Sequence, residues 1–183
     1  MPKVLVPLAQ GCEEIEAVTI IDLLRRANLE VITAGLDAEH VTASRGIVLV
    51  PDTTLADAVT RDDLDMIVLP GGLPGADNLA DCSLLTDTLV RFANEGRYVA
   101  AICAAPRVLA KAGLLDGKRA TAYPGFIDEK DFPKIQYTGA AVETDGNITT
   151  SRGPGTAMDF ALALVEILTD GQTRQTVEAG LVR

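Results

Sequence analysis

The sequence is short of the side chains that most nucleophilic hydrolases need. It contains a single histidine, His40, and no tryptophan, and aromatic residues make up only 4% of its 183 residues. Most cysteine and serine hydrolases rely on a histidine as general base. His40 lies in the polar stretch Asp-Ala-Glu-His, away from the predicted strand ends, so we expect it at the surface. An amidotransferase-like hydrolase with a Cys–His pair is therefore disfavoured.

Long apolar runs and clusters of basic residues are also missing. No window approaches the roughly 18 consecutive apolar residues of a membrane span. The 26 acidic residues outnumber the 16 basic ones, and the formal net charge of −10 argues against binding a nucleic-acid backbone. The three cysteines, Cys12, Cys82 and Cys103, show no metal-ligand spacing, and an odd number favours a reducing compartment. Residues 1–8 are too short for a signal peptide. We expect a cytoplasmic protein with no metal.

What is present is an alternation of short apolar strands with helical periodicity. The length and the 48% apolar content suit a single domain, residues 1–183, with a substantial core. A helix of about fourteen residues is predicted from near Glu13, and further helices over 83–95 and 157–169. Strands are predicted over 3–8, 30–35, 47–50, 66–69, 98–102, near 120, 141–144 and 148–151.

Local signals mark several ends of these elements. Asn28 is a plausible left-handed cap, and Asp145-Gly146 is typical of a hairpin turn. Thr156 resembles the start of a capping box, and Asp170-Gly171 is expected to close the last helix.

The repeated strand–helix–strand units predict an α/β fold with a mostly parallel sheet and helices on both faces. Ligands of such sheets bind beyond the carboxyl ends of the strands. The segments after Leu8, Leu69 and Ile102 are therefore the places to search, and all three carry polar or glycine-rich residues.

Cys103 follows the strand that ends at Ile102, and Pro106 lies in the first turn of the next helix. This predicts a tight strand-to-helix turn with the sulfur near a helix N-terminus. Unpaired amides and the helix dipole favour a thiolate there, so we expect a pKa below the ordinary value of about 8.5. The alternative is a small buried apolar residue, which most free cysteines are. Cys12 is a weaker redox candidate, and we expect Cys82 to serve packing or lie at the surface.

Gly71-Gly72 follows the neighbouring strand and permits a sharp turn that exposes amide donors. The amides of Gly72 and Ala104 are candidates to hold a developing oxyanion beside Cys103. Most glycine pairs only permit a turn, and that alternative remains open.

Three glutamates, Glu13, Glu14 and Glu16, open the first helix, and for at least two of them we expect no role beyond complementing the helix dipole. Glu16 shares a helical face with Ile20 and Ala27, so we expect it to be directed toward the sheet end where Cys103 lies. A carboxylate beside a thiolate is repulsive, so the pair requires burial to raise the pKa of Glu16 until it carries the proton.

These pieces together resemble the ThiJ/PfpI superfamily, in particular the small branch that contains the Parkinson-disease-linked deglycase and its bacterial members. The matching segments span nearly the full chain in family order. They are Gly-Cys-Glu-Glu-Ile-Glu (11–16), Ser-Arg-Gly (44–46), Val-Leu-Pro-Gly-Gly (68–72), Ala-Ala-Ile-Cys-Ala-Ala-Pro (100–106) and Thr-Ser-Arg-Gly-Pro-Gly-Thr (150–156).

The resemblance implies a flavodoxin-like doubly wound sandwich, a homodimer and no cofactor. It implies that Cys103 is the nucleophile, that Glu16 is its protonated partner, and that Gly72 and Ala104 supply the oxyanion amides. Gly71 and Tyr123 are expected to contact substrate, with possible support from Arg45 and Arg152.

Tyr123 is a departure, because many family members have a histidine at this place before a proline. A phenol can donate a hydrogen bond but is a poor base at neutral pH. Cysteine-protease activity is therefore disfavoured.

Two functions from different classes fit these residues. The first is a glyoxalase or deglycase that acts on methylglyoxal, glyoxal or their early adducts on protein or nucleotide groups. The second is a redox-sensing chaperone in which Cys103 is oxidised to a sulfinate without significant catalysis. Neither involves a membrane or sequence-specific nucleic-acid binding.

Overall fold

The computed structural model describes residues 1–183. In chain order its elements are β1 (Lys3–Leu8), α1 (Glu14–Arg26), β2 (Glu30–Gly35), β3 (Val41–Thr42), β4 (Val48–Leu49), β5 (Thr53–Thr54), α2 (Leu55–Ala58), β6 (Met66–Leu69), α3 (Gly75–Asp81), α4 (Ser83–Asn94), β7 (Tyr98–Ile102), α5 (Pro106–Lys111), β8 (Arg119–Ala120), β9 (Gln136–Tyr137), β10 (Val142–Asp145), β11 (Ile148–Ser151), the 3-10 turn η1 (Pro154–Thr156), α6 (Ala157–Leu168) and α7 (Gly171–Gly180).

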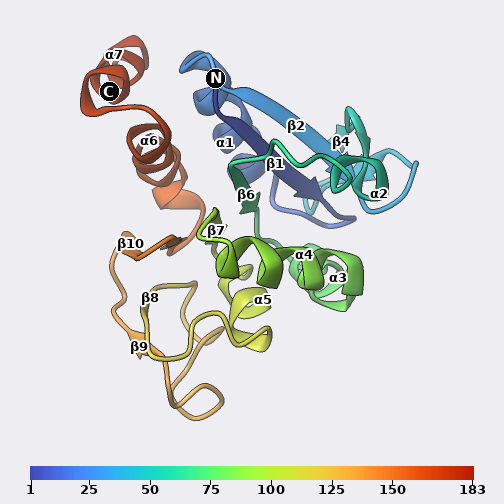
Figure 1. Ribbon diagram of the computed structural model, residues 1–183, viewed down its shortest axis with the longest axis vertical. Coiled ribbons are helices and arrows are strands. Elements are labelled where there is room, and N and C mark those ends of the chain that lie inside the picture. The colour runs from blue at the N-terminus through green and yellow to red at the C-terminus, as the bar shows by residue number, and fades with distance from the viewer.

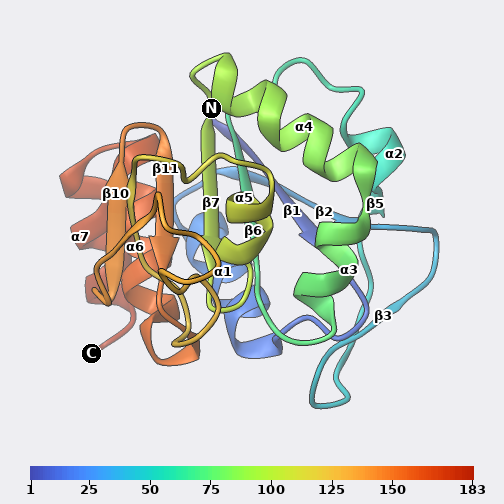
Figure 2. The ribbon, with the colours of Figure 1, turned by 90° about the horizontal axis from the view of Figure 1, so that it is seen from below.

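A seven-stranded sheet forms the middle layer, with strands in the order β10-β11-β7-β6-β1-β2-β5. Only β10 runs antiparallel to its neighbour, β11, and the two lie beside β7 (Figure 2). The predicted α/β fold with a mostly parallel, doubly wound sheet is confirmed. Because the parallel strands point the same way, the residues after β1, β6 and β7 meet at one edge.

Two apolar layers enclose this sheet (Figure 1). Alternate residues of β1 point to opposite faces, so Val4 and Val6 pack with α1, α6 and α7, while Leu5 packs with α2, α3, α4 and α5. Phe160 and Phe92 are fully buried in the first and second layer respectively. None of the helices combines the length and the apolar character needed to span a lipid bilayer.

Two predicted strands lie outside the main sheet. Of residues 47–50 only Val48–Leu49 is a strand, and it pairs with β3 in a separate two-stranded sheet. Val48 is 56% exposed, so this apolar run is not buried in the core. The strand near Ala120 pairs with β9 in a third small sheet.

Two helix-end signals have other roles than predicted. Thr156 precedes α6 but does not cap it: its hydroxyl is 2.7 Å from the Ser151 hydroxyl and accepts from the Gly153 amide at 3.2 Å. The predicted capping box is therefore wrong. Asp170 does more than end a helix, because its Oδ1 accepts from the Thr173 amide at 2.7 Å and so caps the start of α7. The sequence-based prediction did not include α7, α2 or α3.

Candidate active site

Cys103 lies immediately after β7 with a backbone φ of 64°, in the left-handed region that a non-glycine residue rarely adopts. Its amide donates to the Ser151 carbonyl at 2.9 Å, and its carbonyl accepts from the Tyr123 amide at 2.8 Å. These two bonds hold the strained backbone, which costs on the order of 1–3 kcal/mol. The side chain is 8% exposed. The predicted tight turn is confirmed.

Glu16 lies in the first turns of α1 and has no solvent exposure. Its Oε2 accepts from the Gly71 amide at 2.7 Å, whereas its buried Oε1 has no partner of good hydrogen-bond geometry. The carboxyl lies close enough to the thiol of Cys103 to change the pKa of both groups. Burial raises the pKa of Glu16 to about 7, and the Gly71 amide and Cys103 oppose this rise. The predicted upward shift is confirmed.

Gly71 creates the space in which these two side chains meet. A Cβ atom at this position would lie 2.8 Å from the Cys103 Cβ, from the Glu16 Oε2 and from the Ile102 carbonyl oxygen. Since its amide donates to Glu16, Gly71 holds the carboxyl rather than a substrate.

The amides of Gly72 and Ala104 lie close enough to the sulfur of Cys103 for each to lower the pKa of the thiol. Gly72 adopts a φ of 88°, and a Cβ atom there would lie 2.4 Å from the Glu13 nitrogen. The two donors therefore converge at the nucleophile, where an oxyanion hole requires them. Their role in holding an oxyanion remains a prediction.

The direction of the Cys103 pKa differs from the sequence prediction. Burial raises the pKa of this thiol to about 12, and the charge of the neighbouring Glu16 carboxyl acts in the same direction. The amides of Gly72 and Ala104 only partly oppose this. The expected lowering of the Cys103 pKa is therefore wrong for the state in which Glu16 is ionised. If Glu16 carries the proton, its repulsion disappears and the carboxyl donates a hydrogen bond that stabilises the thiolate.

Cys103 opens into a cavity of about 420 Å³. Its wall is formed by Glu13, Ser44, Arg45, Gly72, Leu73, Cys103, Ala104, Tyr123, Phe126 and Pro154. Tyr123 is 49% exposed, and its ring meets that of Phe126 edge-on at 6.0 Å. Among these residues the sequence reading missed Ser44, Leu73, Phe126 and Pro154 and gave Glu13 no role in the site. Pro154 and Ser44 were within quoted motifs, whereas nothing local marked Phe126.

Arg45 reaches the cavity wall because Glu14 holds its backbone. The Glu14 carboxylate accepts from the Ser44 hydroxyl at 2.8 Å and from the Arg45 amide at 2.7 Å. Burial raises the pKa of Glu14, but hydrogen bonds from its own backbone amide, from Ser44 and from the Arg45 and Ile47 amides outweigh burial, so the pKa is lowered. Glu14 is only 5% exposed, so the expectation that it merely complements the helix dipole is wrong.

The other candidates lie away from the cavity. Arg152 donates to the Gly139 carbonyl at 3.0 Å and so supports a neighbouring loop. His40 is exposed, as predicted. Cys12 is fully buried, and burial raises its pKa to about 11, which disfavours reactivity. Cys82 is half-buried, as a packing or surface residue would be. No group of three or more His, Cys, Asp or Glu side chains is arranged to hold a metal ion.

Comparison with known proteins places these features in a family. The model of the DJ-1/PfpI family matches residues 2–167. Protein DJ-1alpha of Drosophila melanogaster is 44% identical over 179 residues, which cover 97% of this chain and 82% of that protein. A Caenorhabditis elegans protein named glutathione-independent glyoxalase DJR-1.2 is 36% identical over 159 residues, covering 87% and 84%. The solved structure of oxidized Toxoplasma gondii DJ-1 superposes with a TM-score of 0.92 at 41% identity, covering 100% of this chain and 98% of the other.

Proposed function

This chain belongs to the DJ-1/PfpI family, and from the geometry of its site we propose that it converts 2-oxoaldehydes to hydroxy acids without a cofactor. The substrates are methylglyoxal and glyoxal, either free or as early adducts on protein or nucleotide amines. Such an enzyme protects a cell against carbonyl and oxidative stress. The similarity to a protein named as a glyoxalase supports the small-carbonyl substrate class.

The first step is attack of the Cys103 thiolate on the aldehyde carbon. The carbonyl oxygen gains the negative charge as the carbon–sulfur bond forms, and the amides of Gly72 and Ala104 stabilise it. The protonated Glu16 then transfers its proton to this oxygen, which gives a hemithioacetal and leaves Glu16 as a carboxylate.

The second step is an internal proton transfer. The Glu16 carboxylate removes the proton from the former aldehyde carbon and delivers it to the neighbouring carbonyl oxygen, which gives an enediol. It then removes the hydroxyl proton on the first carbon and delivers it to the second carbon, which leaves a hydroxyacyl thioester on Cys103. The first carbon is oxidised and the second is reduced, so no external oxidant is needed. A pKa of about 7 suits this role, because an acid–base group works best near the ambient pH.

The observation that carries this proposal is the approach of a fully buried carboxyl, with one oxygen unpartnered, to the nucleophilic sulfur. A buried carboxyl without a counter-ion is destabilising, and the chain retains it where Gly71 leaves room for it. Strongly shifted titratable groups of this kind mark functional sites.

Lactate formation from methylglyoxal tests the proposal. We expect lactate from the wild-type protein and none from Cys103→Ala, because that variant lacks the nucleophile. Cys82→Ala is the matched control, since its thiol lies outside the cavity, and it should retain the wild-type rate. Iodoacetamide should also label Cys103 much faster than Cys82 at pH 7. Lactate production by Cys103→Ala at the wild-type rate would exclude the mechanism.

The same assay separates the two substrate classes. If lactate from a preformed amine adduct appears no faster than the adduct releases free methylglyoxal, the free aldehyde is the substrate. A faster rate identifies the adduct as the substrate.

A redox-sensing chaperone is the second candidate, and the unpartnered Oε1 of Glu16 favours it. A protonated Oε1 would donate a hydrogen bond to a sulfinate on Cys103 and stabilise that oxidation state. Mass spectrometry after mild peroxide treatment should then find two oxygens on Cys103 alone, without lactate formation. Suppression of client aggregation that persists in Cys103→Ser would show a chaperone activity independent of the thiol.

We also expect a homodimer, which five exposed apolar residues support. Ile15 and Val18 on α1 and Ile47, Val48 and Val50 around β4 are each 47–68% exposed. Exposed apolar side chains gathered on neighbouring elements commonly mark an interface, and Val18 and Val50 line one pocket. Sedimentation velocity should show a dimer that Val50→Asp dissociates, while the control Val182→Asp, at a 93% exposed position, leaves it intact.

A further inference from the structure

The proposed function leaves one step without a catalyst, because the thioester on Cys103 must react with water before the product leaves. We propose that Glu13 is the general base that activates this water, an inference that rests on the proposed function. It gives a catalytic role to a residue whose only evident purpose in the sequence was to complement the dipole of α1.

Glu13 is held in place by two contacts. Its backbone adopts an extended conformation at the N-cap of α1, and its Oε2 accepts from the Glu16 amide at 2.8 Å. Its own amide donates to the Gly71 carbonyl at 2.9 Å. No hydrogen bond within the protein engages the Oε1 of Glu13. One oxygen therefore fixes the side chain and the other is free to bind water.

Its position in the cavity matches this role. Glu13 is the only carboxylate among the ten residues of the wall, which also include Cys103. Its nitrogen lies next to Gly72, since a Cβ atom on that glycine would come within 2.4 Å of it. The Glu13 side chain therefore faces the space beside the amides that would hold the thioester oxygen.

The two carboxylates of this helix turn have different environments. Glu16 is fully buried, and the negative charge of Glu13 contributes to its raised pKa. Glu13 faces the cavity instead. When two neighbouring carboxyl groups lie in different environments, the one that stays protonated can act as the acid and the one that stays ionised as the base. Glu16 then serves the proton transfers before the thioester, and Glu13 serves the water that follows.

Other side chains of the wall do not fit this step. Arg45 is a cation, and the phenol of Tyr123 and the hydroxyl of Ser44 are poor bases at neutral pH. His40, the one imidazole of the chain, is not part of the wall.

The step balances in atoms and charge. The Glu13 carboxylate takes one proton of the water as its oxygen attacks the thioester carbon, and the carbonyl oxygen becomes an oxyanion at Gly72 and Ala104. The oxyanion then collapses and breaks the carbon–sulfur bond, so the Cys103 thiolate and the hydroxy acid separate. Glu13 finally releases its proton to solvent, and Glu16 takes up one proton from solvent, which restores the starting state.

Glu13→Gln tests the inference, because glutamine keeps an oxygen that caps the Glu16 amide but cannot take a proton. After mixing with methylglyoxal, the protein is acid-quenched, desalted and treated with hydroxylamine, which converts a lactoyl thioester to lactohydroxamate. We expect steady-state lactate formation to fall about 100-fold or more, as for loss of a general base, while nearly one equivalent of hydroxamate forms. Glu13→Ser, which also caps a helix, should behave alike.

Asp170→Asn is the matched control, since Asp170 caps α7 in the same way far from the cavity. It should show wild-type lactate formation and no hydroxamate. Wild-type turnover in both Glu13 variants would overturn the inference. A loss of turnover without hydroxamate would overturn it as well, because Glu13 would then act through Glu16 before the thioester. Absence of lactate from the wild-type protein would instead refute the proposed function, and this step with it.

Discussion

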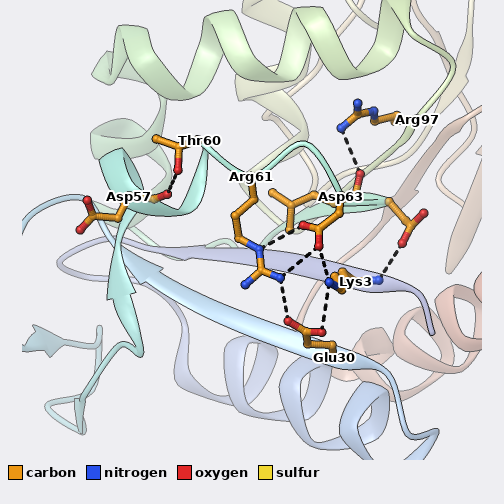
Figure 3. Close-up of polar contacts among 9 residues, drawn as sticks. Lys3, Glu30, Asp57, Thr60, Arg61, Asp63 and Arg97 are labelled. Carbon is orange, nitrogen blue, oxygen red and sulfur yellow. Dashed lines mark hydrogen bonds and ion pairs between the residues drawn. The ribbon is translucent and has the colours of Figure 1, made fainter.

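The two ends of the parallel sheet handle buried and exposed charge in opposite ways. At the amino ends of the strands, Arg61 lies 2.9 Å from Glu30 and 3.1 Å from Asp63, and Lys3 pairs with the same two acids (Figure 3). Each of these four side chains has an opposite partner and is partly exposed. At the carboxyl ends Glu16 is buried without a cation.

The difference appears directly in the two acids. Hydrogen bonds from Lys3 and Arg61 lower the pKa of Asp63 to about 2, whereas burial raises the pKa of Glu16 to about 7. One end is arranged so that its charges stabilise one another. The other keeps a carboxyl in an unfavourable environment, which is typical of a site where chemistry takes precedence over stability.

Gly71→Ala should have the largest effect on stability and activity, because it disrupts the end of the sheet that holds the buried Glu16. Its new Cβ would lie 2.8 Å from backbone as well as side-chain atoms, so the strand end or Glu16 must move. We expect the free energy of unfolding to fall by about 1–3 kcal/mol, as for an overpacked core, and lactate formation to be lost. Urea denaturation and the lactate assay measure these effects. The control is Gly180→Ala, because nothing lies within 4 Å of its new Cβ; equal behaviour of the two variants would contradict the steric argument.

Glu16→Gln should reverse part of the stability cost. The folded-state pKa of about 7 lies above the ordinary value of 4.5, so the folded protein binds the extra proton between these values. Stability therefore decreases as the pH rises from about 4.5 to 7, by roughly 3 kcal/mol at 1.36 kcal/mol per unit. Glutamine removes this pH dependence. The free energy of unfolding of the variant should therefore rise relative to that of the wild type as the pH increases to 7, and the difference should persist above pH 7.

The same variant separates the thiolate from the proton transfer. Glutamine still donates a hydrogen bond to sulfur, so iodoacetamide labelling of Cys103 should persist while lactate formation falls. Unfolding curves from pH 4 to 8 that stay parallel for variant and wild type, or an unchanged turnover, would exclude the acid–base role of Glu16.

Asp63→Asn should change stability least, and its pH dependence should be opposite to that of Glu16→Gln. Because the pKa of Asp63 is lowered in the folded state, its contribution is present above its ordinary pKa and is lost as the pH falls toward about 2. The variant should be slightly less stable than wild type at pH 7, and the difference should disappear at acidic pH. It should also disappear near 1 M salt, where the Debye length is about 3 Å. A stability difference between the variant and the wild type that persists in high salt would show that salt does not screen the ion pairs of Asp63 with Lys3 and Arg61.

Much of the fold could be predicted from local pattern. The apolar runs at β6 and β7, the glycines after β6 and Cys103 after β7 identified both the core strands and the edge at which the site lies. The same reasoning failed at Val48, where an apolar run marks an exposed hairpin. Apolar composition cannot distinguish a strand covered by helices from one that faces solvent or another molecule.

The site was predictable in identity but not in environment. A short segment between a strand and Pro106 was enough to place Cys103 on a tight turn, where the structure gives it a φ of 64°. The pKa of its thiol is raised rather than lowered, because burial and the charge of Glu16 outweigh the dipole of a six-residue helix. Glu13 and Glu14 were indistinguishable in sequence, yet one faces the cavity and the other anchors Arg45.

The sequence by itself determined the order of the longer strands and helices, the turn that presents Cys103, and the glycines that allow a close backbone approach. These features depend on periodicity and on local backbone preference. Only the tertiary structure decided which glutamate is buried, which one faces the cavity and how they meet the sulfur. The Glu16–Gly71 bond joins residues 55 apart in the chain. Burial and through-space electrostatics arise only when such distant segments pack together, and these effects set the protonation states on which the proposed chemistry depends.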